Sequence, residues 1–213
     1  MAVAYTRGIR TSLCITGAKR RLPAFIRFGY CRASNTEATR AHMMIDFQAC
    51  RLGEGAEPLA LESSADHCAA LLVLATQATR SLHIFSHQLD RRVYDQKPFL
   101  ETITQLVLRS PQCKVLLLVR DTHDMLHNGH RLIDVIRRVP SRMQLRKVHE
   151  DHLKTTEEFV VADETGLLLR RIAGRYEGSV NFNARKAARE RINFFNEVWR
   201  LSEPDPKLKH LSI

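Results

Sequence analysis

Several features that define large protein classes are missing from this sequence. No apolar run approaches the roughly 20 residues that a membrane-spanning helix needs. The five cysteines are scattered and odd in number, and no Cys-x-x-Cys spacing occurs, which argues against a disulfide framework or a zinc site. There is no internal repeat and no low-complexity tract. We therefore expect a soluble, cytoplasmic globular protein from a reducing compartment.

Cofactor and metal motifs are also missing. No glycine-rich loop of the kind that holds a pyrophosphate is present. His123, His127 and His130 have helical spacing, but no acid or cysteine stands at a convincing distance, and Gly129 interrupts the segment. A solvated loop is the simpler interpretation, so the sequence predicts no cofactor and no metal.

The net charge of +10 is unevenly distributed. Residues 1–45 contain eight basic residues and one acid, whereas the other 168 residues contain 25 basic and 22 acidic side chains. This basic leader has three interpretations: an arm that binds nucleic acid or acidic lipid, a targeting peptide, or translated sequence upstream of a start at Met43-Met44. We expect the leader to lie outside the folded core, a folded domain over 46–202, and a disordered tail over 203–213.

Helical and strand patterns alternate along the domain. Ser63-Ser64-Ala65-Asp66 has the form of a capping box and predicts a helix start. Strand patterns follow at 81–86, 113–119 and 143–148, and the stretches from about 95 and 130–139 have helical periodicity between them. This alternation predicts an α/β protein with a mixed, mostly parallel sheet and helices on both of its faces. A hairpin over 159–169 and a closing helix over 184–199 complete the pattern.

Motif residues are concentrated in the last third of the chain. His152-x-Lys154 precedes the hairpin around Asp163, and Gly178-Ser179-x-Asn181 precedes the closing helix, which carries Asn193, Asn196 and Glu197. This order resembles the C-terminal half of a phospholipase D-type domain. In that family the histidine attacks phosphorus, and the lysine and small polar residues bind the phosphate oxygens.

The resemblance implies a role for particular residues. His152 and Lys154 would be catalytic, and Ser179 and Asn181 would bind a phosphate-bearing ligand. Arg185 and Arg189, on the helix that follows, would complete the phosphate site. A second His-x-Lys would come from a partner subunit, which implies a homodimer. Each residue also has a simpler interpretation: a solvated loop for His152 and Lys154, helix capping for Ser179 and Asn181, and an exposed helix face for the arginines.

The spacing of the motif departs from the family pattern, in which four residues separate the lysine from an aspartate. Counting from Lys154 places Phe159 at the aspartate position. Counting back from Asp163 instead places Thr156 and Glu158 where the histidine and lysine belong. A strand cannot absorb such a shift without a bulge or a loop. We therefore expect a catalytically degenerate domain.

A second resemblance covers roughly residues 46–199. Four motifs carry it: 129–133 (Gly-His-Arg-Leu-Ile), 159–166, 175–177 (Arg-Tyr-Glu), and Phe195 with Trp199. They are similar to a bacterial domain of unknown function that occurs beside acetyltransferases of the GNAT type. The resemblance implies an accessory domain, because no acetyltransferase domain is evident.

Three functions follow as hypotheses. The first is a degenerate phospholipase D-like domain that binds a partner protein or a phosphate-bearing ligand. The second is a dimeric phosphodiesterase or nuclease that uses His152 and Lys154. The third is a nucleic-acid-binding module that acts through the basic leader.

Overall fold

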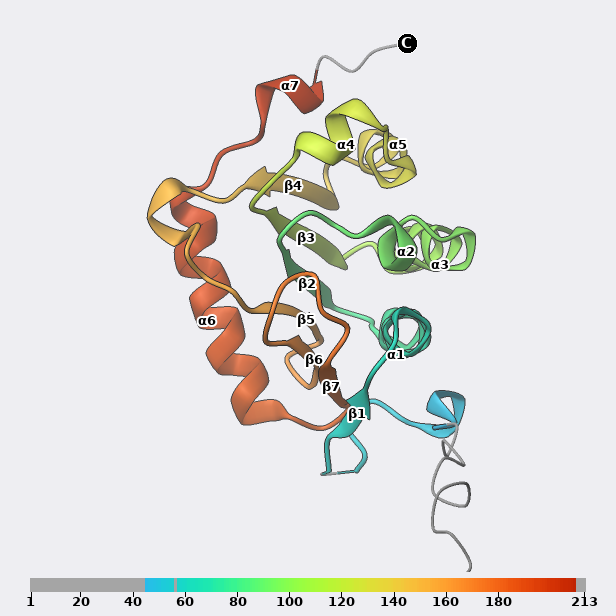
Figure 1. The fold of residues 1–213 in the computed structure, drawn as a ribbon. Helices are drawn as coiled ribbons and strands as arrows, with labels where there is room; N and C mark the ends of the chain where they lie inside the picture. Colours follow the sequence, from blue (N-terminus) through green and yellow to red (C-terminus); the bar gives the residue numbers. More distant parts are fainter. Residues whose placement is uncertain (1–44, 56, 210–213) are drawn as a thin grey trace, which may run out of the picture. The chain divides into compact units, whose positions relative to one another are not determined.

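A seven-stranded sheet forms the centre of the domain in the computed structural model, which describes residues 45–55 and 57–209 (Figure 1). Apart from Ile45, the predicted leader lies outside the described residues, as do residues 210–213. The strand order in the sheet is β1-β7-β6-β5-β2-β3-β4. The strands are β1 (Leu59–Leu61), β2 (Ser81–Ser86), β3 (Lys114–Val119), β4 (Met143–Lys147), β5 (Glu158–Ala162), β6 (Gly166–Arg170) and β7 (Gly178–Asn181).

Helices cover both faces of the sheet. One face is covered by α1 (Ser64–Gln77), α2 (Arg91–Tyr94), α3 (Lys97–Arg109), α4 (His123–His127) and α5 (Arg131–Arg138). On the opposite face α6 (Arg185–Leu201) crosses the strands from the β7 side towards β4 (Figure 1). Short helical turns complete the described chain at η1 (Phe47–Ala49), η2 (Glu150–His152) and α7 (Pro206–Lys209). No helix in the described part of the chain combines the length and apolarity needed to cross a membrane.

Local sequence signals account for where the helices begin. The Ser63 side chain accepts a hydrogen bond from Asp66 N, and the Asp66 carboxylate accepts one from Ser63 N, so the predicted capping box is present. Pro98 lies in the first turn of α3, where its missing N–H costs no helical hydrogen bond.

The expectation of a mostly parallel sheet is wrong. Only β2–β3 and β3–β4 are parallel, whereas the other four pairings are antiparallel. The two parallel pairs are the ones that the helical crossovers through α3 and α5 join. After β4 the chain returns to the middle of the sheet, and β5 enters beside β2 in the opposite direction. The hairpin β5–β6 and the strands β7 and β1 then extend this antiparallel half.

Asp163 fixes the predicted hairpin to the start of β2. Asp163 and Glu164 have φ values of 50° and 56°, and Thr165 N donates to Ala162 O, which is the geometry of a type I′ turn. The Asp163 carboxylate accepts hydrogen bonds of 2.7–2.9 Å from the backbone N–H groups of residues 79–81 and from the Thr79 hydroxyl. This carboxylate therefore has a structural role in the turn.

Side-chain alternation divides the apolar residues into two cores. Leu82 and Ile84 of β2 belong to the core under α1, α3 and α5, whereas Phe85 belongs to the core under α6. The α6 core contains Phe159 and Val161 of β5 together with Phe195 and Val198 of α6. Because each strand alternates between the two cores, every polar residue near a strand end can be assigned to one face.

Residues 203–209 do not form the disordered tail that the sequence predicts. Glu203 forms an isolated bridge with Lys147, and α7 follows. Asp205 is buried and accepts a 2.7 Å hydrogen bond from the Thr122 hydroxyl. The proline-rich composition of this segment is compatible with order because these contacts with the rest of the domain satisfy its polar groups.

Three buried histidines, His67, His83 and His130, predict an acid-sensitive fold. Burial lowers the pKa of each ring below the ordinary value of 6.5. The unfolded chain therefore binds protons that the folded chain rejects, so the stabilisation is present above pH 6.5 and is lost as the pH falls. We expect the free energy of unfolding, measured with urea, to decrease between about pH 7.5 and pH 5.5.

Paired variants identify the source of this dependence. His67→Gln should reduce the pH dependence of the free energy of unfolding, because glutamine does not titrate. The glutamine amide can still donate to the Tyr176 carbonyl oxygen that the His67 ring contacts, so the fold should be kept. His123→Gln, in the exposed turn of α4, should leave the pH dependence unchanged. If the free energy of unfolding changes equally with pH in wild type and His67→Gln, this histidine does not contribute to the acid sensitivity.

Candidate functional site

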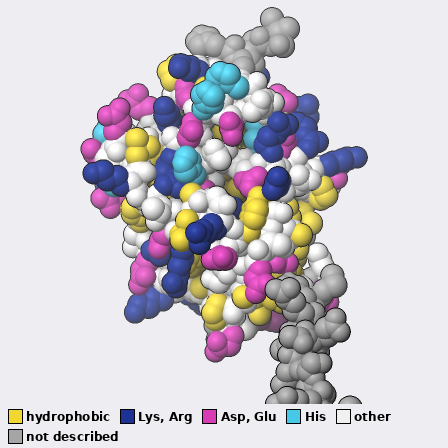
Figure 2. Space-filling model, in the orientation of Figure 1, with side chains coloured by type: hydrophobic (Ala, Val, Ile, Leu, Met, Phe, Trp, Pro, Cys, Tyr) yellow, Lys and Arg dark blue, Asp and Glu magenta, His cyan; other side chains and the backbone are white. Residues whose placement is uncertain are grey.

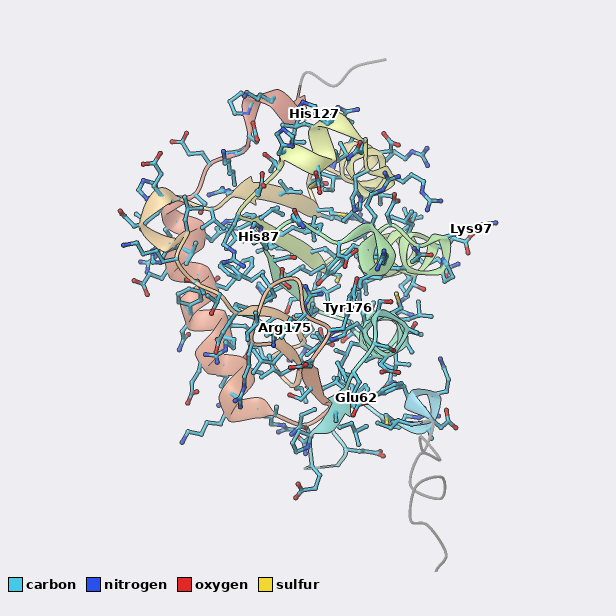
Figure 3. The ribbon with its side chains drawn as sticks, in the orientation of Figure 1. Glu62, His87, Lys97, His127, Arg175 and Tyr176 are labelled. Carbon is cyan, nitrogen blue, oxygen red and sulfur yellow. The ribbon has the colours of Figure 1, made fainter. Side chains whose placement is uncertain are left out.

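Polar residues gather where four neighbouring strands reach one edge of the sheet. β2 ends at Ser86, and β3 is followed directly by Arg120. Beside them, β5 begins with Glu158 and β6 ends with Arg170. This edge faces the viewer in Figure 1, and His87, Arg175 and Tyr176 lie beside it in Figure 3. Figure 2 shows lysine and arginine side chains interspersed with acids on this side of the molecule, as the near-balanced charge of the domain predicts.

Glu158 and Arg170 form a buried ion pair at the centre of this edge. Both residues are 5% exposed, and Arg170 Nη2 lies 2.5 Å from Glu158 Oε2. Glu158 Oε1 accepts hydrogen bonds from Ser86 Oγ at 3.0 Å and from His87 N at 2.6 Å. The carboxylate therefore has three partners, which is the condition under which a protein tolerates a buried charge.

The loop 171–177 covers this ion pair. The Arg170 guanidinium lies 5.4 Å from the centre of the Tyr176 ring. The Tyr176 hydroxyl donates to Asp90 Oδ2 at 2.5 Å, and the Tyr176 carbonyl oxygen lies 2.8 Å from His67 Nε2. Burial, followed by the hydrogen bond with Asp90, raises the pKa of Tyr176. The loop is thus held to α1 and to the start of α2 by its tyrosine.

Gly178 has a packing requirement of its own. A Cβ atom at this position would stand 2.5 Å from the Leu169 carbonyl oxygen and 3.1 Å from the His67 ring. The glycine of the predicted Gly-Ser-x-Asn motif is therefore needed where β7 approaches α1 and β6.

The hairpin shows where one of the two registers of the family pattern, the one counted from Asp163, falls in the fold. Asp163 lies in the turn, so the register counted from it follows β5 back to Glu158 and to Thr156 just before the strand. In this register a buried carboxylate stands where the phospholipase D pattern has a cation. Sequence reasoning missed Arg170, although Glu158 and Arg170 are equidistant from Glu164 and hairpin symmetry alone would pair them.

His152 and Lys154 lie before β5 rather than on it. His152 ends η2, is half-buried and packs edge-on against Phe194 of α6, with ring centres 5.8 Å apart. Lys154 is exposed in the turn that follows.

The predicted ligand-binding residues lie near the beginning of α6. Ser179 and Asn181 are on β7, and the Asn181 side chain accepts a 2.8 Å hydrogen bond from Asn183 N. Arg185 and Arg189 are exposed in the first turns of the helix. These four residues come from adjoining segments of the chain.

His152 lies farther along α6 than this group. The register aligns Phe85, Phe159, Leu169 and Ser179 in one row across the sheet. Phe194, the neighbour of His152, contacts the first two of these side chains. Three strand spacings separate Ser179 from Phe85, which is about 14 Å. The two predicted groups therefore occupy different positions on the same face.

The structural relatives of this domain share its fold at low sequence identity. An archaeal chromatin protein, TrmBL2, aligns with 14% identity and a TM-score of 0.54 over 71% of this chain. The match spans 55% of that protein. NucT from Helicobacter pylori aligns with 9% identity and a TM-score of 0.51, over 70% of this chain and 99% of its own. Nuc from Salmonella typhimurium, a phospholipase D family member, aligns with 13% identity and a TM-score of 0.50, over 69% and 97%.

These comparisons confirm the expected phospholipase D-like fold. No curated protein matches the sequence significantly. Residues 63–211 match the family model of a domain of unknown function, DUF7931, which covers more than half of the chain. The chain therefore belongs to the DUF7931 family.

Proposed function

We propose that this domain binds a phosphate-bearing ligand, or a partner that presents one, without hydrolysing it. The observation that carries the proposal is the burial of Glu158, which the register counted from Asp163 places where the family resemblance implies a lysine. A carboxylate there cannot supply the positive charge that a phosphodiester needs at this position.

Arg170 does not replace the missing cation. Its guanidinium contacts Glu158 directly, so the pair carries no net charge. Catalysis of phosphoryl transfer depends on positive groups that are free to meet the charge that develops in the transition state. An ion pair that is already satisfied offers little of this stabilisation.

Arg185 and Arg189 support the binding part of the proposal. Both are exposed, and neither forms an ion pair with any described residue. They lie in the first turns of a 17-residue helix, whose N-terminus favours an anion. Ser179 and Asn181, on the strand that leads to this helix, supply hydroxyl and amide groups nearby. One structural relative is a chromatin protein with a described mode of DNA binding, so nucleic acid is one ligand to test.

We expect the purified protein to bind a labelled single-stranded oligonucleotide without cleaving it. Fluorescence anisotropy should show binding that weakens at least about 10-fold in an Arg185→Ala/Arg189→Ala variant, because each lost phosphate contact costs roughly 1 kcal/mol or more. Arg138→Ala, an exposed arginine on α5, is the matched control and should bind as wild type does. Gel analysis of the same samples should show intact oligonucleotide.

Cleavage would favour the alternative function. If the protein hydrolyses the oligonucleotide, and His152→Ala abolishes hydrolysis while the chain stays folded, the domain is a phosphodiesterase or nuclease that uses His152 and Lys154. That function would require a homodimer to supply the second catalytic pair. The half-buried position of His152 beside Phe194 is the observation that favours it.

The cellular setting is also part of the proposal. We infer a cytoplasmic accessory domain, for which the resemblance to acetyltransferase-associated domains names one class of partner. The basic leader would add contacts to nucleic acid if it is present in the cell.

A further inference from the structure

Buried nitrogen atoms without a hydrogen-bond partner gather on the α6 side of the candidate site. Within the described residues six such side-chain nitrogens occur, and four of them belong to three residues: Nδ1 of His87, Nε and Nη2 of Arg120, and Nε of Arg191. Buried polar groups in proteins are nearly always paired, so an unpaired group needs an explanation. A cluster of unpaired nitrogens next to a candidate binding site points to a ligand that accepts hydrogen bonds.

Backbone pairing brings His87 and Arg120 together. Arg120 N donates to Ser86 O at 3.1 Å, and Asp121 N donates to His87 O at 2.7 Å, so the β2–β3 pairing continues beyond the strand ends. The register therefore places His87 beside Arg120, about 4.8 Å away along the sheet. Phe85 and Leu118, two residues before them, belong to the core under α6, so alternation places both His87 and Arg120 on the α6 side.

No carboxylate of the described chain contacts the Arg120 guanidinium. The residue is only 7% exposed and forms no ion pair with a described acid. The guanidinium carbon lies 6.0 Å from the centre of the Phe85 ring. Glu158 attracts it, but that carboxylate already contacts Arg170, Ser86 and His87 N. Glu157, the acid on the other side of His87, pairs with Arg191 at 3.0 Å.

The unpaired edge of Arg120 has the geometry of an oxyanion receptor. Nε and Nη2 form the side of a guanidinium that donates two parallel hydrogen bonds to a carboxylate or a phosphate. Both atoms are shielded from solvent, so a ligand must displace the side chains that cover them. Changes of side-chain rotamer are common when a protein binds a partner.

We propose that Arg120, assisted by His87, binds the phosphate group of the ligand at the end of β3 on the α6 side. This inference rests on the proposed function and gives its ligand an anchoring residue that the sequence did not indicate. His152 packs on Phe194, which contacts Phe85, the ring below Arg120. A phosphate held by Arg120 would therefore lie at the Phe85 end of this row, on the side of His152 and apart from Arg185 and Arg189.

An uncompensated buried charge predicts an unusual stability effect. Arg120→Met replaces the guanidinium with an apolar side chain of similar length. We expect this variant to unfold at the same urea concentration as wild type or at a higher one, because removing an unpaired buried charge relieves a desolvation cost. A purely structural arginine would give a clear loss of stability instead.

Inorganic phosphate provides the direct test. We expect phosphate to raise the melting temperature of wild type in a saturable manner, at ionic strength held constant with sodium chloride, because a ligand that binds only the folded state stabilises it. Arg120→Met should lose this shift. Arg120→Lys keeps the positive charge but cannot donate two parallel hydrogen bonds. It should need at least about 10-fold more phosphate for the same rise in melting temperature. Sodium acetate, in a parallel titration, distinguishes a phosphate site from a general carboxylate site.

The outcomes separate this inference from the proposed function. No phosphate-specific shift in wild type, or an equal shift in Arg120→Met, would overturn it. A larger shift with acetate than with phosphate would also contradict the assigned ligand. If the oligonucleotide binds in an Arg185- and Arg189-dependent manner but independently of Arg120, the proposed function stands and this inference fails. If Arg120→Met loses the phosphate shift and no oligonucleotide binds, the anion site stands and nucleic acid is not the ligand.

Discussion

Arg170→Met is expected to lower the free energy of unfolding by about 3–5 kcal/mol, which is the usual cost of removing one partner of a buried ion pair. The substitution removes the ion-pair partner of the Glu158 carboxylate, which is 5% exposed in the wild type. Its hydrogen bonds with Ser86 and His87 N do not neutralise it. Urea unfolding monitored by circular dichroism measures the change. Arg171→Met, at the exposed neighbouring position, is the matched control and should change stability by less than about 0.5 kcal/mol.

The double variant Glu158→Gln/Arg170→Met separates charge from packing. Glutamine retains an oxygen that accepts from Ser86 Oγ and His87 N, but it carries no charge. Most of the lost stability should therefore return, because replacing both members of a buried pair is often neutral. A single-variant loss below about 1 kcal/mol would mean that water reaches the pair. It would also weaken the argument that Glu158 blocks catalysis.

Phe195→Ala should also destabilise the domain by about 3–5 kcal/mol. Phe195 is fully buried at 0% exposure, and its ring contacts His83 at 5.0 Å and Trp199 at 5.6 Å between ring centres. Truncation leaves a cavity between α6 and the sheet that the strand backbone cannot fill. The measurement is again urea unfolding.

Trp199→Ala is the comparison for this prediction. Trp199 is only partly buried; it stacks on Phe195 and lies 4.4 Å from the Arg146 guanidinium. We expect the Trp199 variant to lose less stability than the Phe195 variant, and the reverse order would show that the end of α6 carries more of the packing.

The candidate site could be predicted from the sequence only in part. His152, Ser179, Asn181, Arg185 and Arg189 were found because they match a linear motif. Arg120 and Arg170 belong to no such motif, and the motif 175–177, which contains Tyr176, gave that residue no role at the site. The covering loop 171–177 likewise has its anchors on α1 and near α2.

The sequence by itself determined the local elements. The capping box at Ser63, the turn at Asp163 and the apolar periodicity of α6 act over a few residues, so composition and spacing were sufficient to locate them. Each of these elements is present at the expected position in the structure.

Tertiary structure alone decided how the strands pair and which charges meet. The return of the chain to place β5 antiparallel to β2 made most of the sheet antiparallel, because strand direction depends on long-range docking rather than on local periodicity. That same pairing placed the Glu158 carboxylate beside Ser86 and His87 N, and Arg120 forms no ion pair with a described acid. The contacts of these side chains depend on cross-strand register, which joins residues far apart in the sequence and which no local pattern specifies.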